Sequence, residues 1–286
     1  MPCPERSRER GVTLIEMVIV ISITAIIAGA VSVFISRPVE GYADAARRAE
    51  MTDIADTALR RMTRDLRTAL ANSIRITNAG NVTYIEYLQS SGGGRYRSDV
   101  DPGGGGNPLD FTAADIDFDV IGAMPSISAG DSIVIYNLAP GSGTSDAYAA
   151  PPNNNRAAFS SITGNKINLV AAKLFPFSSP GKRFQVVQYP VTYACDPLPA
   201  GTGDLRRYWG YDIQPSQPTP TPASPPAGSG SAQALLASNV AACSFTYVTS
   251  GAAQRTGVVM LSLQIQESGS ADTIRLFQQV HVTNVP

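Results

Sequence analysis

The chain has 286 residues, of which 43% are hydrophobic and only 16% charged. An average soluble domain is about 25% charged, and disordered chains combine high charge with low hydrophobicity, so the composition excludes a disordered tail protein. The formal net charge of −1 argues against a nucleic-acid partner bound through counterion release.

The first feature along the chain is an apolar segment from Val12 to Ile35, which has no charged residue after position 16. As a helix it reaches roughly 36 Å, at about 1.5 Å per residue, whereas a bilayer core is about 30 Å thick. A leader with three arginines precedes it, and the positive-inside rule keeps that leader in the cytoplasm. The Ala-x-Ala exit of a secretory signal peptide is absent. We therefore expect a single-pass anchor in a lipid bilayer, with the C-terminal part outside the cytoplasm.

One carboxylate, Glu16, interrupts the apolar segment near its start. At membrane depth a charge costs about 2.5–3.5 kcal/mol or more, so it needs either a partner or a place near the interface. One explanation is an interfacial Glu near a helix N-terminus, where the dipole favours an anion.

The residues around Glu16 suggest another explanation. Gly11-Val12-Thr13-Leu14-Ile15-Glu16 resembles the prepilin signature of type IV pilins and type II secretion pseudopilins, although most family members have Phe where this chain has Val12. The resemblance implies that a prepilin peptidase cleaves between Gly11 and Val12 and that the new Val12 amine is N-methylated. It also implies that this amine neutralises Glu16, four positions away on one helix face, in the same chain or in a neighbouring subunit.

The same resemblance implies a location. The precursor is expected in the bacterial inner membrane, with its C-terminal domain in the periplasm, before it enters a pilus or pseudopilus filament. We divide the chain into a cleaved leader (1–11), a transmembrane and assembly helix (12–36), an amphipathic helix (37–72) and a β-rich domain (73–286).

Pro38 follows the membrane segment and is expected to break or kink the helix. From Tyr42 to Ala71, apolar residues recur every three or four positions, which predicts a second, amphipathic helical stretch. Acidic and basic residues alternate on its other face and nearly cancel, which indicates a solvated face or, alternatively, contacts between filament subunits. The apolar stripe consists of Met51, Ile54 or Ala55, Ala58 or Leu59, Met62, Leu66 and Leu70.

From Ser73 onward the pattern changes to short alternating runs, which predict strands. A helix followed by many strands indicates an α+β fold, with the long N-terminal helix packed on a largely antiparallel sheet. This arrangement is the pilin fold that the prepilin resemblance implies. The expected strands are Val82–Leu88, Asp131–Tyr136, Lys166–Val170 and Phe184–Tyr189, with a closing hairpin formed by Gly257–Gln266 and Thr273–Val282.

Several loops are biased in composition. We interpret the glycine runs 92–94 and 103–106 as flexible connections, because they lack the Lys-Ser/Thr of a phosphate-binding loop. Residues 215–231 are rich in proline and predict an exposed, extended loop.

Three cysteines are present, and Cys3 is lost with the leader. Cys195 and Cys243 remain in an oxidising compartment, where an even pair predicts a disulfide, the alternative being two buried free thiols. A zinc-type metal site is not expected, because His281 is the only histidine and there is no Cys-x-x-Cys.

Asp115, Asp117 and Asp119 alternate with apolar residues, so on a strand their carboxylates would face one side. Such a row must be solvated, paired with arginine or neutralised by a hard cation such as calcium. We favour a solvated edge, with arginine pairing and calcium as weaker alternatives.

Catalytic signatures are missing from the sequence. It contains no Gly-x-Ser-x-Gly elbow, zinc motif or dinucleotide fingerprint, so we expect neither an enzyme nor a cofactor.

Further stretches narrow the resemblance to O-type minor pilins of mannose-sensitive haemagglutinin (MSHA) pilus systems and to the related PilW-like and J-type minor pseudopilins. This implies a minor pilin of an MSHA-like type IV pilus, whose partners are other major and minor pilins and the inner-membrane assembly platform. The alternatives are a J-type pseudopilin of a type II secretion system, a pilus-associated adhesin, or an anchored periplasmic protein with no filament role. The stretches are 58–67, 72–75, 84–88, 93–97, 207–211, 242–247 and 280–286.

Overall fold

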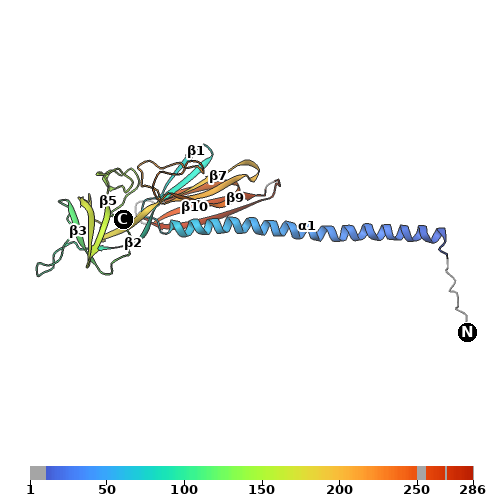
Figure 1. Cartoon of the computed structure of the whole chain (residues 1–286), viewed down its shortest axis with the longest axis horizontal. Coiled ribbons are helices and arrows are strands. Elements are labelled where there is room, and N and C mark those ends of the chain that lie inside the picture. Colours follow the sequence, from blue (N-terminus) through green and yellow to red (C-terminus); the bar gives the residue numbers. More distant parts are fainter. Residues whose placement is uncertain (1–10, 250–255, 268, 286) are drawn as a thin grey trace, which may run out of the picture. The chain divides into compact units, whose positions relative to one another are not determined.

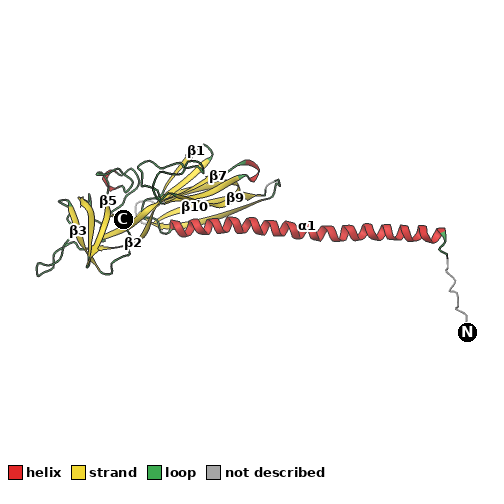
Figure 2. Cartoon of the chain, viewed as in Figure 1, coloured by secondary structure: helices red, strands yellow, loops and turns green. Residues whose placement is uncertain are grey.

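The structure is a computed structural model that describes residues 11–249, 256–267 and 269–285 (Figure 1). Residues 1–10 of the predicted leader therefore lie outside the described residues. Two compact units, 1–50 and 51–286, divide the chain. A single long helix, α1 (Leu14–Leu66), is followed by a large antiparallel sheet, which confirms the predicted α+β class (Figure 2).

Helix α1 corrects two of the expectations for the region after the membrane segment. Pro38 lies inside the helix and does not break it. A proline removes one N–H donor, but its fixed φ is already helical, so the turns on either side can continue. The helix also ends at Leu66, not near residue 72. Beyond that point the backbone pairs with the sheet, since the N–H of Leu70 donates to the carbonyl oxygen of Leu88 at 2.8 Å.

The described residues after the helix form eleven strands and two short 3₁₀ turns, η1 (Gly143–Ser145) and η2 (Pro199–Gly201). Neighbouring strands follow the order β1-β2-β3-β6-β5-β4-β7-β8-β9-β10-β11, with an additional β2–β7 pairing. The predicted closing hairpin is confirmed as β10 paired with β11. The strands are β1 (Arg75–Ala79), β2 (Val82–Tyr96), β3 (Asp115–Ile121), β4 (Ser132–Val134), β5 (Arg156–Thr163), β6 (Lys166–Lys173), β7 (Arg183–Asp196), β8 (Gly203–Trp209), β9 (Ala232–Thr249), β10 (Thr256–Gln266) and β11 (Thr273–Thr283).

The β-rich domain contains two large apolar cores. In the first, the end of α1 packs its apolar stripe against side chains of β2 and β7–β11, which confirms the periodicity of three and four. The second lies under β3–β7 and contains Phe118 and Phe184, whose rings pack edge to face 5.7 Å apart. The buried stripe consists of Met51, Ala55, Ala58, Leu59, Met62 and Leu66.

The first glycine run is part of a strand, so the expectation of a flexible connection there is wrong. Gly93 and Gly94 lie in β2 and pair with Gln185 and Phe184 of β7. A Cβ on Gly93 would come within 2.5 Å of the carbonyl oxygen of Phe184, and a Cβ on Gly94 within 2.8 Å of the Phe184 ring. Glycine is therefore required at both positions, because strands β2 and β7 approach each other too closely for a side chain.

A buried polar cluster connects the end of α1 to the sheet. Asp65 accepts hydrogen bonds from the Tyr193 hydroxyl at 2.7 Å and from Nε of Arg207 at 2.9 Å, and Nε of Arg61 lies 3.1 Å from its other oxygen. The side chains of Asp65 and Arg207 are only 8% and 7% exposed. Burial and the neighbouring Asp65 carboxylate raise the pKa of Tyr193. We refer to these four residues as the Asp65 cluster.

Asp65→Asn is expected to destabilise the domain, because it leaves the buried guanidinium of Arg207 without its counter-charge. Breaking a buried pair in this way costs about 3–5 kcal/mol. Asp56→Asn is the matched control, since the ion pair of Asp56 with Arg60 is exposed and such pairs contribute about 0–1 kcal/mol. Urea unfolding measures the free energy of unfolding of each variant. Equal losses of this free energy in the two variants would contradict the structural role of the Asp65 cluster.

Candidate functional site

The start of α1 is fixed by its own first residues. Helical structure begins at Leu14, and the N–H of Glu16 donates to Oγ1 of Thr13 at 3.4 Å. Thr13 is thus the N-cap and Glu16 the third helical residue, which is the Ser/Thr-x-x-Glu arrangement of a capping box. The sequence analysis missed this signal, although Thr13-Leu14-Ile15-Glu16 contains it in full.

The cap describes Val12 and Glu16 before cleavage, and the expected pairing of the two in the cleaved chain stays a prediction. Val12 lies ahead of the cap, outside the helix, so the two residues do not share a helix face in this uncleaved chain. An N-cap residue has non-helical backbone angles, so the chain before it leaves the helix path. Neutralisation of Glu16 by the amine of a neighbouring chain does not require that shared face and stays a prediction.

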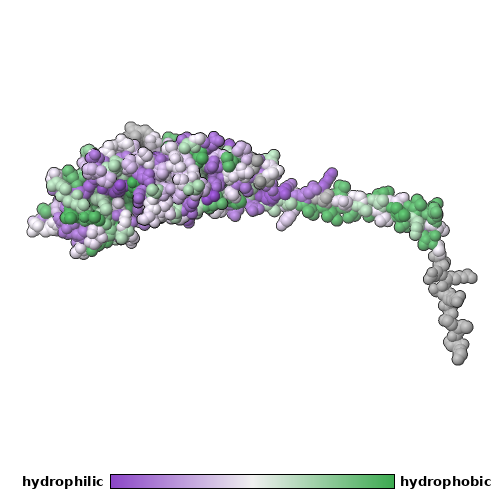
Figure 3. Space-filling view, turned by 45° about the horizontal axis from the view of Figure 1, so that its top comes forward, coloured by the Kyte–Doolittle hydropathy of each residue, from purple (hydrophilic) through white to green (hydrophobic). Residues whose placement is uncertain are grey.

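Between Met17 and Ile35, helix α1 carries no charged residue on any side. Its large apolar side chains between Val12 and Ile35 are 48–84% exposed, and Figure 3 shows them as a continuous hydrophobic surface on this part of α1. The hydroxyls of Ser22 and Thr24 donate to the carbonyl oxygens of Val18 and Val20, so they do not require water. In length and composition this helix can cross a membrane.

Cys195 and Cys243 form a disulfide between β7 and β9. Their Cα atoms are 6.6 Å apart, and Cys195 is fully buried in the first core. The 48-residue separation spans strand β8 and the whole proline-rich segment, so the bond closes the largest irregular region of this part of the domain.

The proline-rich segment 215–231 is held at its beginning, and in this respect it is less free than predicted. Arg75 donates to the carbonyl oxygens of Pro215 at 2.6 Å and Gln214 at 2.9 Å. Arg75 is itself held by the buried carboxylate of Glu86 at 2.6 Å, which also accepts a hydrogen bond from Tyr211 at 2.9 Å.

Further along the same segment, Pro220 is buried and lines a small hollow together with Tyr84 and Tyr208. Proline presents a rigid apolar surface that packs well against aromatic rings. The neighbouring prolines are mostly exposed, so the prediction of an extended surface loop holds only for parts of the segment.

The three aspartates of β3 are not brought together. Asp119 is 7% exposed and lies 3.4 Å from Nε of Arg97, whereas Asp117 lies 3.4 Å from Nζ of Lys166. The favoured solvated edge is therefore wrong for Asp119, where arginine pairing applies, because the strand turns this carboxylate toward the Arg97 guanidinium and the backbone N–H of Asn107, which donates to it at 2.9 Å. Within residues 11–249, 256–267 and 269–285, no group of three His, Cys, Asp or Glu residues could hold a metal ion.

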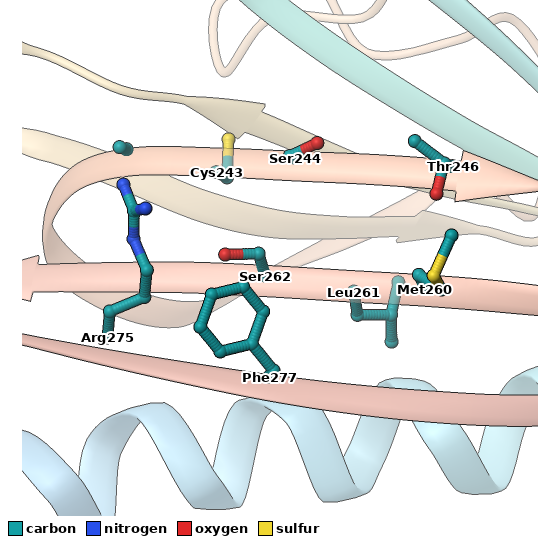
Figure 4. Close-up of a pocket in the computed structure, with 9 residues that line it drawn as sticks. Cys243, Ser244, Thr246, Met260, Leu261, Ser262, Arg275 and Phe277 are labelled. Carbon is teal, nitrogen blue, oxygen red and sulfur yellow. The ribbon is translucent and has the colours of Figure 1, made fainter.

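The outer face of β9–β11 is partly apolar. A hollow of about 310 Å³ lies there. Figure 4 shows two of its lining residues, Met260 and Phe277, on neighbouring strands, with Arg275 at one end. Phe277 is 71% exposed and Met260 48%. This face is opposite the one that covers α1, since the alternate residues Val259, Leu261 and Leu263 are buried in the first core.

The comparisons with known proteins concern the N-terminal segment. The family model for the prokaryotic N-terminal methylation motif matches residues 6–32. Neither the comparison with curated proteins nor that with solved structures finds a match. The motif and the apolar helix support a type IV pilin-like protein anchored in the inner membrane, processed by a prepilin peptidase and assembled with other pilins.

Removing the disulfide is expected to destabilise the domain. For a closed loop of 48 residues the chain-entropy model gives about 4 kcal/mol. Cys195→Ser with Cys243→Ser should therefore unfold at a markedly lower urea concentration than the oxidised chain, while the oxidised chain in reductant should approach the variant. A double variant as stable as the oxidised chain would contradict this prediction.

Proposed function

We propose that this chain is a minor pilin, a low-copy structural subunit of an MSHA-like type IV pilus that acts in pilus assembly. The single observation that carries a filament-subunit role is the prepilin-type methylation motif at residues 6–32, which overlaps the apolar helix that contains Glu16. The choice of an MSHA-like minor pilin rests on the resemblance described for the stretches between residues 58 and 286. Prepilin peptidase removes the leader after Gly11, the Val12 amine is methylated, and the helix then leaves the bilayer for the filament.

Charge pairing explains why Glu16 is retained in an apolar segment. A lone carboxylate in lipid is costly, and an amine from an adjacent subunit removes that cost only once the subunits are stacked. The pair therefore favours one axial register between neighbouring helices.

The globular domain supplies a second contact surface. The exposed Met260 and Phe277 on β9–β11 form an apolar patch on the side away from the first core, where a neighbouring pilin can dock. The proposed role is structural and not enzymatic, in line with a sequence that contains no Gly-x-Ser-x-Gly elbow, zinc motif or dinucleotide fingerprint.

A J-type minor pseudopilin of a type II secretion system is the second candidate. The methylation motif favours it equally, because the resemblance quoted for residues 11–16 covers both classes. Deleting the gene for this chain in a strain that has both a type IV pilus and type II secretion distinguishes the two candidates. Loss of pili with normal secretion identifies the minor pilin.

Processing at Gly11 is the first testable consequence. N-terminal sequencing and mass spectrometry of the protein from its own cells should give a chain that begins at Val12 and carries one methyl group on the amine. In cells without prepilin peptidase the chain should retain the leader ahead of Val12. A leader that remains intact in cells with active peptidase would overturn the proposal.

The second consequence concerns Glu16. Glu16→Ala should leave membrane insertion unchanged and lower incorporation into sheared filaments about tenfold or more, as expected for the loss of one charge-assisted interaction. Glu40→Ala is the matched control, because Glu40 is an exposed carboxylate on the same helix outside the apolar segment. Normal incorporation of the Glu16 variant, or an equal loss in the control, would contradict the assigned role.

A further inference from the structure

A groove opens where strands β5 and β6 separate. The ladder between them runs from Phe159 opposite Leu169 to Thr163 opposite Lys166. Before Phe159, strand β5 pairs with β4, whereas the far end of β6 reaches β3, where Lys173 lies opposite Asp115. The space between the separated ends has a volume of about 600 Å³ and is bordered by Pro151, Pro152 and residues 211–213.

Two cations face this groove, Arg156 from β5 and Lys173 from β6. Arg156 donates to the carbonyl oxygen of Ala147 at 3.0 Å, and Nζ of Lys173 donates to the carbonyl oxygen of Pro152 at 2.8 Å and to Oδ1 of Asn154 at 2.9 Å. All three acceptors are neutral. A guanidinium has five donors and an ammonium three, so both groups retain donors for a ligand.

The electrostatic environment of the groove favours an incoming anion. Burial and the nearby positive charge of Arg156 lower the pKa of Lys173, which shows that the two cations repel each other. Three carboxylates lie nearby. Asp146 attracts Arg156 but accepts the backbone N–H groups of Gly141 and Tyr148, and Asp212 is exposed at the border. Asp115, opposite Lys173 on β3, accepts the backbone N–H groups of Asp110 and Asp117. A bound anion would relieve the repulsion between Arg156 and Lys173.

The rest of the lining is small and uncharged. The separated strand ends contribute alanines and one valine, which form a low apolar wall, and Gln188 adds an amide. The volume is far larger than a single inorganic anion requires and lies in the range of sites for ligands of several rings. The alanines and the valine are Ala157, Ala158, Val170, Ala171 and Ala172.

We propose that this groove binds a short acidic saccharide, whose carboxylate or sulfate is held by Arg156 and Lys173 while its rings lie along the alanine-rich wall. The match rests on charge complementarity and on a lining that suits the apolar faces of sugar rings. This binding is independent of the filament role, so each can fail without the other.

The test uses the full-length chain in detergent micelles and isothermal titration calorimetry with trigalacturonate. Maltotriose is the neutral control, and sodium acetate and sodium sulfate are the free anions. The proposal predicts saturable binding of trigalacturonate that weakens with added salt and is about tenfold or more tighter than that of any control. Equal binding of maltotriose would remove the role of charge, and equal binding of free acetate or sulfate would reduce the site to a simple anion site; either result overturns the proposal.

Variants locate the binding without disturbing the fold. Ala171 is exposed in the groove on the same side of β6 as Lys173, so Ala171→Asp adds a repelling charge without removing a structural contact, and Ala171→Ser is its control. Lys173→Gln should also weaken binding about tenfold, whereas Arg183→Gln, which changes an exposed cation outside the groove, should not. Thermal unfolding checks that each variant is folded. Unchanged affinity in folded Ala171→Asp and Lys173→Gln would overturn the assignment of the groove.

Discussion

The constraint on which the account depends is that the apolar helix from Val12 to Ile35 cannot remain in water. Each large apolar side chain gains about 1.5–3 kcal/mol when it is covered, and those of this segment are at least 48% exposed. A lipid bilayer can cover them, and in the proposed filament the helices of other subunits do so. A bilayer-spanning anchor would meet this requirement, and within such an anchor the carboxylate of Glu16 needs a partner.

The last part of α1 meets a different requirement. From Met51 to Leu66 the helix is amphipathic, and its apolar stripe completes the first core of the β-rich domain. The Asp65 cluster adds a directional contact with β7 and β8, which an apolar stripe alone would not supply. One continuous helix thus combines a segment that needs an external partner with a segment that is part of a folded domain.

Much of the fold could be predicted from the sequence, because hydrophobic periodicity is a local signal. It identified the membrane segment, the buried stripe of α1 and the β10–β11 hairpin. Strand β9 was missed because Ala232–Thr249 is rich in alanine, which has low strand propensity. The glycines of β2 resemble a linker in the sequence, because Phe184, which leaves no room for a Cβ at Gly93 and Gly94, is distant along the chain. The burial of Asp119 and the groove at Arg156 and Lys173 likewise depend on long-range pairing, whereas the capping box at Thr13 was a local signal that could have been used.

The central claim is that Glu16 is neutralised by the N-terminal amine of a neighbouring subunit. Carbodiimide treatment of purified filaments, followed by mass spectrometry, tests it directly, because this reagent joins a carboxylate only to an amine in contact with it. The account predicts a cross-linked peptide in which the Glu16 side chain is joined to the N-terminal amine of an adjacent subunit. Filaments in which other carboxylates are cross-linked while Glu16 is recovered unmodified would contradict it.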